Sequence, residues 1–213
     1  MAKGSATPVS AIGVLISGRG SNLQSLIDAQ SAGELPARIA VVISNKAGAP
    51  GLDRAKAAGI EALTISHRDF PDRDAFDRAL AQALMDRGVT LVCLAGFMRL
   101  IGRPLLDAFP DAILNIHPSL LPAFPGVDAQ AQALAHGVKV SGATVHLVNG
   151  DLDAGPIIAQ ATVPVKDDDT PESLAKRILV EEHRLYPLAV RIVLTAGWRI
   201  DGRRFVRSPD AQV

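Results

Sequence analysis

The chain contains little of several features that would direct it to particular classes of protein. Its 213 residues include one cysteine, 4% aromatic residues and equal numbers of basic and acidic residues, 22 of each. The single cysteine, Cys93, excludes a disulfide within the chain and a zinc site built from several cysteines. Zero net charge gives no general attraction to nucleic acid or to an anionic membrane. We therefore expect neither partner, and we expect a reducing compartment such as the cytoplasm.

Long apolar runs are also missing. The stretch Ala11–Ile16 is stopped by Ser17-Gly18-Arg19-Gly20, which leaves it far below the ~20 residues that a membrane span needs. It is also too short for a secretory signal. Hydrophobic residues still make up 48% of the chain, enough for one sizeable core. The sequence predicts a single domain over residues 11–206, with flexible termini at 1–10 and 207–213.

Short strand-like runs alternate with amphipathic stretches in the first half of the chain. Residues 12–17, 38–44, 62–66 and 90–95 are largely apolar and rich in β-branched side chains. Residues 21–32, 50–58 and 73–87 repeat apolar side chains every three or four positions, as helices do. This alternation predicts an α/β fold with a doubly wound, mostly parallel sheet that helices cover on both faces.

The pattern changes in the second half of the chain. Five prolines between Pro104 and Pro125 predict mostly loop and short strand there. Two β-rich runs, 138–148 and 156–165, are separated by an acidic loop at 149–155, and they predict an antiparallel edge to the sheet. Thr170 and Pro171 are a typical helix start, for a helix that continues to about Thr195. Residues 198–206 are expected to form a closing hairpin.

A glycine loop, Ser17-Gly18-Arg19-Gly20-Ser21-Asn22, joins the first predicted strand to the first predicted helix. Backbone N–H groups at such a helix start can converge on an anion, and a phosphate is the natural ligand. The loop lacks the third glycine of the dinucleotide fingerprint and the Gly-Lys-Ser/Thr of a Walker loop. A monophosphate site and a simple tight turn both remain open as interpretations.

A second group of polar residues lies around Asn115-Ile-His117-Pro. In an extended run, residues two apart point to the same face, so the amide and the imidazole are expected side by side. An amide donor beside a proton carrier suits the stabilisation of an oxyanion. The alternative is a structural histidine bonded to nearby backbone.

The acidic loop could supply a carboxylate to this group. Asp153 could reach His117 and hold its ring, or it could simply cap its own turn. His146, on the strand that enters the loop, is a reserve candidate. Because the sequence has no nucleophile elbow and no His-Glu-x-x-His motif, it favours direct transfer without a covalent intermediate and requires no metal.

Four segments together resemble one family. They are Val14-Leu-Ile-Ser-Gly-Arg-Gly-Ser-Asn-Leu-Gln24, Leu94-Ala-Gly-Phe-Met-Arg99, Leu114-Asn-Ile-His-Pro-Ser-Leu-Leu-Pro122 and Asp151-Leu-Asp-Ala-Gly-Pro-Ile157. From about Ala11 to about Arg204 the chain is similar to the phosphoribosylglycinamide formyltransferases, or GAR transformylases, of the formyltetrahydrofolate-dependent superfamily. The resemblance implies a Rossmann-like fold and transfer of a formyl group from 10-formyltetrahydrofolate to the glycinamide amine of 5'-phosphoribosylglycinamide, in de novo purine biosynthesis.

The resemblance also implies roles for individual residues. Asn115 and a protonated His117 would hold the oxyanion, and Asp153 would orient His117 and assist proton transfer. The ribose phosphate and a ribose hydroxyl would be bound by Gly20, Ser21, Asn22 and Glu182. The co-substrate 10-formyltetrahydrofolate would lie against Arg73, Phe97, Met98, Arg99, Leu100, Ile101, Asn149 and Asp151.

The chain departs from the family pattern at Arg19, where asparagine is frequent, and at Asp128 and Gln130, where histidine is frequent. Among the alternatives, methionyl-tRNA formyltransferase is expected to add a carboxy-terminal RNA-binding domain, and formyltetrahydrofolate hydrolase an amino-terminal regulatory domain. The extent of this chain favours neither of them. A non-catalytic folate- or phosphate-binding relative is a further alternative. The expected partners are small-molecule substrates, and the expected state is a monomer or a homodimer.

Overall fold

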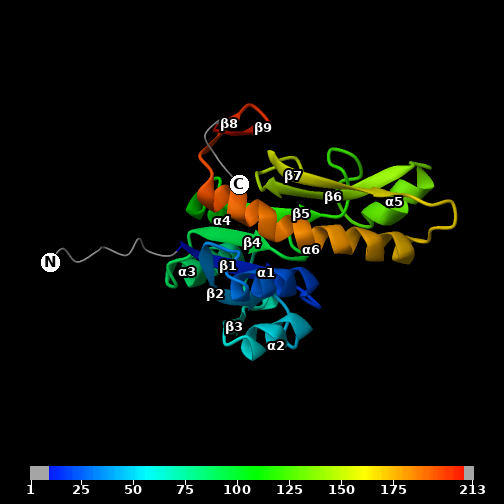
Figure 1. Cartoon of the computed structure of the whole chain (residues 1–213). Coiled ribbons are helices and arrows are strands. Elements are labelled where there is room, and N and C mark those ends of the chain that lie inside the picture. The colour runs from blue at the N-terminus through cyan, green and yellow to red at the C-terminus, as the bar shows by residue number, and fades with distance from the viewer. Residues whose placement is uncertain (1–9, 209–213) are drawn as a thin grey trace.

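A mixed sheet in the strand order β3-β2-β1-β4-β5-β6-β7-β9-β8 organises the chain (Figure 1). A computed structural model describes residues 10–208. Strands β1 to β5 pair in parallel, whereas β6 is antiparallel to both β5 and β7, and β8 is antiparallel to β9. The strands are β1 (Ser10–Ile16), β2 (Ala37–Ser44), β3 (Glu61–Thr64), β4 (Leu91–Leu94), β5 (Ile113–His117), β6 (Val140–Leu147), β7 (Ile157–Pro164), β8 (Trp198–Asp201) and β9 (Arg204–Arg207). The predicted parallel sheet with an antiparallel edge is confirmed.

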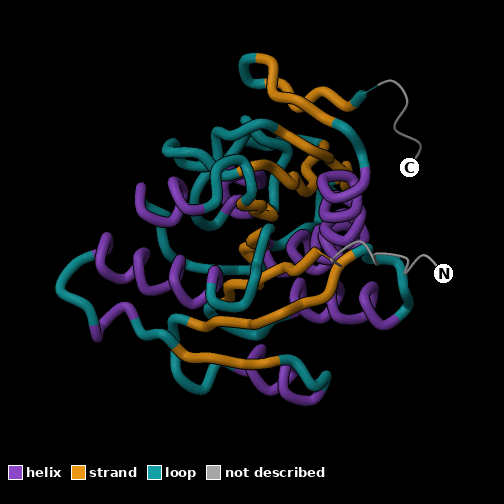
Figure 2. The backbone as a smooth tube through the Cα atoms, turned by 90° about the vertical axis from the view of Figure 1, so that its left-hand side faces the viewer, coloured by secondary structure: helices purple, strands orange, loops and turns teal. Residues whose placement is uncertain are grey.

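Helices cover both faces of this sheet, as Figure 2 shows. One face packs against α1 (Ser21–Ser31), α2 (Pro50–Ala57), α5 (Ala129–Ala135) and α6 (Pro171–Thr195). The other face packs against α3 (Arg73–Met85), which follows the short helix η1 (His67–Asp69), and α4 (Arg103–Ala108). Adjacent residues of β1 divide between the two cores, because successive side chains of a strand point to opposite faces. This explains why nearly every position of β1 is apolar.

The proline-rich stretch contains more helix than the sequence predicts. Residues 103–108 form α4, with Pro104 in its first turn, where a missing N–H breaks no hydrogen bond. Helix α5 was not predicted either. The long helix α6 was predicted: its Thr170 side chain accepts a hydrogen bond from the Ser173 N–H at 3.2 Å. The prediction of mostly loop was therefore wrong at α4, because a proline breaks a helix only beyond its first turn.

The expectation of flexible termini falls mainly on residues 1–9 and 209–213, which lie outside the described residues. Of the positions that are described, Ser10 opens β1 and Arg207 closes β9. Within residues 10–208, none of the helices has the length and apolar character needed to cross a membrane.

Tyr186 connects α6 to the centre of the sheet. Its side chain is fully buried, and its hydroxyl lies 3.0 Å from the Leu94 carbonyl in β4 and 3.2 Å from the Leu114 carbonyl in β5. We expect Tyr186→Phe to lower the free energy of unfolding by about 1–3 kcal/mol, because the two buried carbonyls lose the single O–H donor that they share. Urea denaturation measures this loss.

The control is Thr195→Val, which removes an exposed hydroxyl bonded to the Arg191 carbonyl and should change stability by less than about 0.5 kcal/mol. Equal stability of Tyr186→Phe and the wild type would show that the tyrosine hydroxyl does not stabilise the sheet.

Candidate active site

The predicted site residues follow the carboxyl ends of three adjacent parallel strands. The glycine loop follows β1, the segment 97–101 follows β4, and His117 is the last residue of β5. The strand order reverses direction between β1 and β4. At such a point the connecting loops diverge to opposite faces of the sheet, and this leaves room for a ligand. The topology therefore brings three distant parts of the sequence to one edge.

The Asp153 carboxylate lies between Asn115 and His117. Its Oδ2 is 3.4 Å from His117 Nδ1, and its Oδ1 accepts a hydrogen bond from Asn115 Nδ2 at 3.4 Å. The Gly126 N–H donates to Oδ2 at 2.8 Å. The side chains of His117 and Asp153 are only 5% and 10% exposed. The three predicted catalytic residues thus meet in one cluster that is largely closed to solvent.

Asp153 reaches this cluster through an unusual backbone conformation. Its φ is 48°, in the left-handed region that residues other than glycine rarely adopt. The loop therefore turns back over the sheet, and the side chain contacts the loop around Gly126 rather than capping its own turn. Phe124, in that facing loop, is also left-handed, with φ 56°. Strained conformations of this kind occur often at functional sites.

The ring of His117 contacts protein groups at both nitrogens. Nε2 lies 2.8 Å from the Phe124 carbonyl, and because a carbonyl can only accept, Nε2 carries a proton. Nδ1 faces the Asp153 carboxylate. A second proton on Nδ1 would turn this contact into a charge-assisted hydrogen bond. The backbone bond expected for a structural histidine and the carboxylate contact expected for a catalytic one are both present.

His146 belongs to the same cluster. Its Nδ1 donates to the Leu147 carbonyl at 2.8 Å, and its Nε2 lies 3.2 Å from Asn115 Nδ2 and 3.6 Å from Asp153 Oδ1. The sequence ranks His146 only as a reserve candidate. The signal that places it here is the antiparallel register, which sets Asn115 directly opposite His146. That pairing depends on the tertiary fold and is not visible in the local sequence.

Opposing effects act on the pKa of Asp153. Burial alone would raise it, but the close contact with His146, the hydrogen bond from the Gly126 N–H and the charges of His117 and His146 together hold it below its ordinary value. The carboxylate is therefore ionised at neutral pH. A buried carboxylate between two imidazoles is suited to orienting them and to accepting a proton.

The glycine loop has the close packing that a tight strand-to-helix turn requires. Gly20 has φ 71°, and a Cβ there would lie 2.7 Å from Cα of Gly51, which is in α2. The Gly51 N–H donates to the Gly18 carbonyl at 3.1 Å. Within the described residues, no side chain caps the start of α1. Its first N–H groups, at Ser21 and Asn22, are therefore available to an anion.

Asn22 and Glu182 form a buried pair beside this helix start. Asn22 Nδ2 donates to Glu182 Oε2 at 2.7 Å, and the two residues are 8% and 7% exposed. The Oδ1 atom of Asn22 is buried, and no partner for it exists among residues 10–208. Burial raises the pKa of Glu182, and the hydrogen bond from Asn22 opposes part of that rise. The structure thus joins two predicted substrate-binding residues that are 160 positions apart.

The buried position of Glu182 predicts a pH-dependent stability. The pKa of Glu182 is higher in the folded chain than in the unfolded chain, where it is about 4.3. The contribution of the protonated carboxyl to the free energy of unfolding is therefore fully present below about pH 4.3, and it is lost as the pH rises through the higher folded pKa. We therefore expect Glu182→Gln to gain stability relative to the wild type as the pH rises from 4 to 8, in urea titrations. Glu181→Gln controls for the loss of a carboxylate from α6. A difference between Glu182→Gln and wild type that does not change with pH would contradict this.

The residues expected at the folate differ in exposure. Phe97 is 9% exposed and stacks on Phe76 at 6.5 Å between ring centroids, so it supports the segment from within the core. The side chains of Met98 and Leu100 are 70% and 60% exposed. Ile101 is half-buried, whereas the other residues predicted to contact the folate are exposed: Arg73, Arg99, Asn149 and Asp151. The segment 97–101 therefore presents apolar side chains and one guanidinium group to solvent.

Two further apolar residues near the cluster were not predicted from the sequence as part of the site. Val127 and Leu152 are 76% and 57% exposed, on the two loops that meet through Gly126 and Asp153. A Cβ on Gly126 would lie 3.7 Å from Leu152 Cδ2, so these loops pack closely. The sequence predicted a loop at 149–155, but nothing in it showed that this loop faces the segment that carries Val127.

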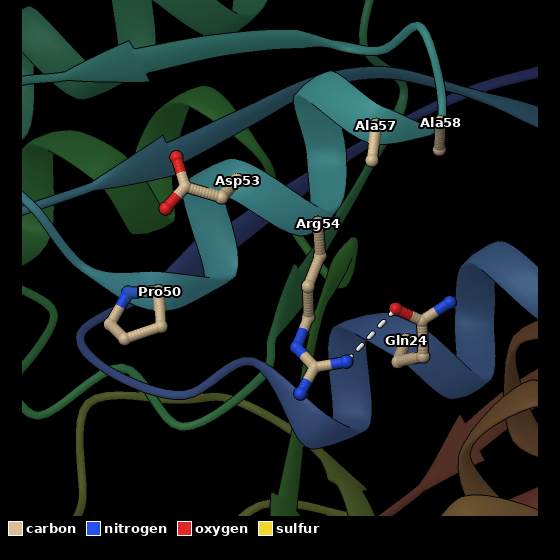
Figure 3. Close-up of a pocket in the computed structure, with 6 residues that line it drawn as sticks. All are labelled: Gln24, Pro50, Asp53, Arg54, Ala57 and Ala58. Carbon is tan, nitrogen blue, oxygen red and sulfur yellow. Dashed lines mark hydrogen bonds between the residues drawn. The ribbon is translucent and has the colours of Figure 1, made fainter.

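A separate hollow of about 580 Å³ lies between α1 and α2 (Figure 3). Arg54 crosses it and donates to the Gln24 side chain at 3.1 Å and to the Arg19 carbonyl at 2.9 Å. The side chain of Arg19 is exposed, as is Asp128 at the start of α5. The catalytic cluster does not line this hollow. In the described part of the chain, no group of three or more His, Cys, Asp or Glu side chains could hold a metal ion.

Known proteins resemble the chain over nearly its whole length. Residues 10–190 match the formyl transferase family model. The chain is 42% identical over 190 residues to phosphoribosylglycinamide formyltransferase of Escherichia coli K12, which covers 89% of this chain and 87% of that protein. The structure of glycinamide ribonucleotide transformylase 1 from Symbiobacterium toebii matches with a TM-score of 0.92 at 55% identity, over 96% of this chain and 98% of that one.

A second group of relatives is much longer. The chain is 47% identical over 189 residues, 89% of its length, to the trifunctional purine biosynthetic protein adenosine-3 of Bos taurus. It spans between 14% and 19% of the length of the trifunctional relatives that it matches. The matched part is therefore a small fraction of each of those proteins.

Proposed function

The chain belongs to the formyl transferase family, and from this premise we propose that it transfers a formyl group from 10-formyltetrahydrofolate to the glycinamide amine of 5'-phosphoribosylglycinamide. The observation that carries the proposal is the Asp153 carboxylate, which contacts both Asn115 and His117 in one buried cluster. A degenerate, non-catalytic relative would have no need to keep an ionised carboxylate buried between two imidazoles.

The proposed reaction needs a donor for a developing oxyanion and a route for one proton. Attack of the amine on the formyl carbon places negative charge on the formyl oxygen, and the amine must then lose a proton while the departing nitrogen gains one. Asn115 supplies an amide N–H, and His117 supplies an imidazole that can carry the proton. Asp153 orients His117 and balances its charge.

The sugar phosphate would bind beside α1. The free N–H groups at the start of this helix suit a phosphate, since the helix dipole favours negative charge there. Asn22 Oδ1, buried without a protein partner, would accept a hydrogen bond from the ligand. Glu182, held by Asn22, would accept one from a ribose hydroxyl. These contacts support a phosphorylated sugar as the acceptor substrate.

The formyl donor would bind on the segment after β4. Exposed Met98 and Leu100 side chains offer an apolar surface for a flat heterocycle, and the guanidinium groups of Arg73 and Arg99 suit a tail of carboxylates. The residues present therefore fit a folate. When bound, the folate supplies the activated formyl group, and the protein supplies position, hydrogen bonds and a proton route.

The test is an absorbance assay for the deformylated folate product with three acceptors in parallel: glycinamide ribonucleotide, initiator methionyl-tRNA and water. We expect turnover with the ribonucleotide alone. Turnover with the tRNA or with water would replace the proposal by one of the two related activities, and turnover with none of them would support a non-catalytic binding protein. We propose the cytoplasm as the site of action, because Cys93 is a buried free thiol.

A further inference from the structure

Ser17 connects the two loops to which the two substrates are assigned. It follows β1 directly, begins the glycine loop and is 5% exposed. Its Oγ accepts a hydrogen bond from the backbone N–H of Met98 at 2.8 Å, and its own N–H donates to the Gly96 carbonyl at 3.0 Å. One residue at the start of the phosphate-binding loop therefore bonds to the segment that carries the exposed Met98 and Leu100 side chains.

A third element sets the direction of the Ser17 hydroxyl. A serine hydroxyl has one proton, and here it is donated to Asn45 Oδ1 at 2.6 Å. Asn45 follows β2 and is 2% exposed. Because the proton is committed to Asn45, the lone pairs of Ser17 Oγ are left to accept from Met98. The relay Asn45–Ser17–Met98 thus joins the loops after β2, β1 and β4, which are adjacent in the sheet.

The segment 97–101 has little else to hold it. Among residues 10–208, the bond to the Met98 N–H is the only hydrogen bond that reaches the backbone of 97–101. The next anchor is Gly102, whose N–H donates to the fully buried Asp77 carboxylate at 2.6 Å. Phe97 packs in the core, but the two following apolar side chains are in solvent. The position of the segment relative to the glycine loop therefore depends on Ser17.

We propose that Ser17 is a positioning residue that holds the formyl-donor segment 97–101 at a set distance from the phosphate-binding loop. This inference rests on the proposed function, since it assigns the two loops to the two substrates. A segment held in advance loses less conformational freedom on binding, so the bond should act mainly on the affinity for the folate. Ser17 itself touches neither reacting group.

The matched variants are Ser17→Ala and Ser44→Ala. Ser44, at the end of β2, is fully buried like Ser17, but its hydroxyl bonds only to the backbone of Lys46. It therefore controls for the loss of a buried serine hydroxyl from this edge of the sheet. Ser17→Ala leaves the Met98 N–H without its acceptor, and we expect KM for 10-formyltetrahydrofolate to rise about tenfold, with kcat within about threefold of wild type.

Amide hydrogen exchange of the ligand-free protein supplies a readout that does not depend on catalysis. We expect the amides of Met98 to Leu100 to exchange about tenfold faster in Ser17→Ala and at the wild-type rate in Ser44→Ala. Asn45→Ala should change both readouts in the same direction, but less, because Ser17 Oγ remains as an acceptor.

Unchanged exchange of 98–100 in Ser17→Ala would overturn the proposal, and so would an equal rise of KM in Ser44→Ala. Failure of the proposed function looks different: the wild type would then show no formyl transfer, while the exchange measurements would still decide whether Ser17 holds the segment.

Discussion

We expect His117→Ala to lower kcat by at least about a hundredfold while the protein remains folded. The variant loses the ring that contacts both Asp153 and the Phe124 carbonyl, so the proposed oxyanion donor and proton carrier is gone. Loss of a positioned acid or base, or of an oxyanion donor, typically costs two to three orders of magnitude, about 10²–10³. Steady-state rates with the ribonucleotide and the formyl folate measure the effect, and circular dichroism verifies the fold.

His136→Ala is the matched control for this experiment. His136 is an exposed histidine at the end of α5, and its ring lies tilted against Phe124 with 5.2 Å between the ring centroids. We expect it to keep kcat within about twofold of wild type. If His117→Ala also turned over at nearly the wild-type rate, His117 would have no role in the chemistry, and the mechanism built on it would have to be abandoned.

Asp153→Asn keeps the shape of the side chain, removes its charge and should lower kcat by about a hundredfold or more. In the wild type the pKa of Asp153 is held below its ordinary value, so the carboxylate stays ionised around neutral pH and its protonation does not limit the rate there. The variant removes the negative charge 3.4 Å from His117 Nδ1. The pH–rate profile of the variant should therefore shift relative to that of the wild type.

The control is Asp111→Asn, the same change at another aspartate with a left-handed backbone, φ 53°, in the exposed turn before β5. Because asparagine also tolerates this conformation, neither variant should suffer from backbone strain. A pH profile of Asp153→Asn that matches the wild type would show that the carboxylate and the imidazole do not communicate. In that case the contact between them would be structural.

Most elements of the fold follow from neighbours along the chain. Apolar spacing predicted the strands and helices of the first half, and Thr170 with Pro171 predicted the start of α6. The prediction failed at α4, because Pro104 lies in the first turn of the helix, where a proline breaks no hydrogen bond. It also omitted α5, whose short run of alanine and glutamine residues carries little apolar periodicity. Apolar periodicity and helix-start residues relate positions within one turn of a helix or two residues of a strand.

The site depends on both the local sequence and the tertiary structure. The sequence by itself determined which residue types stand at the ends of β1 and β5, and the period of two in a strand put Asn115 and His117 on one face. Only the tertiary structure decided that Asp153 lies between His117 and His146, that Asn22 pairs with Glu182, and that Ser17 holds Met98. These contacts join residues that are between 7 and 160 positions apart in the chain. Strand order and register bring them together, and both are set by how the whole sheet buries its two apolar faces, which no local pattern encodes.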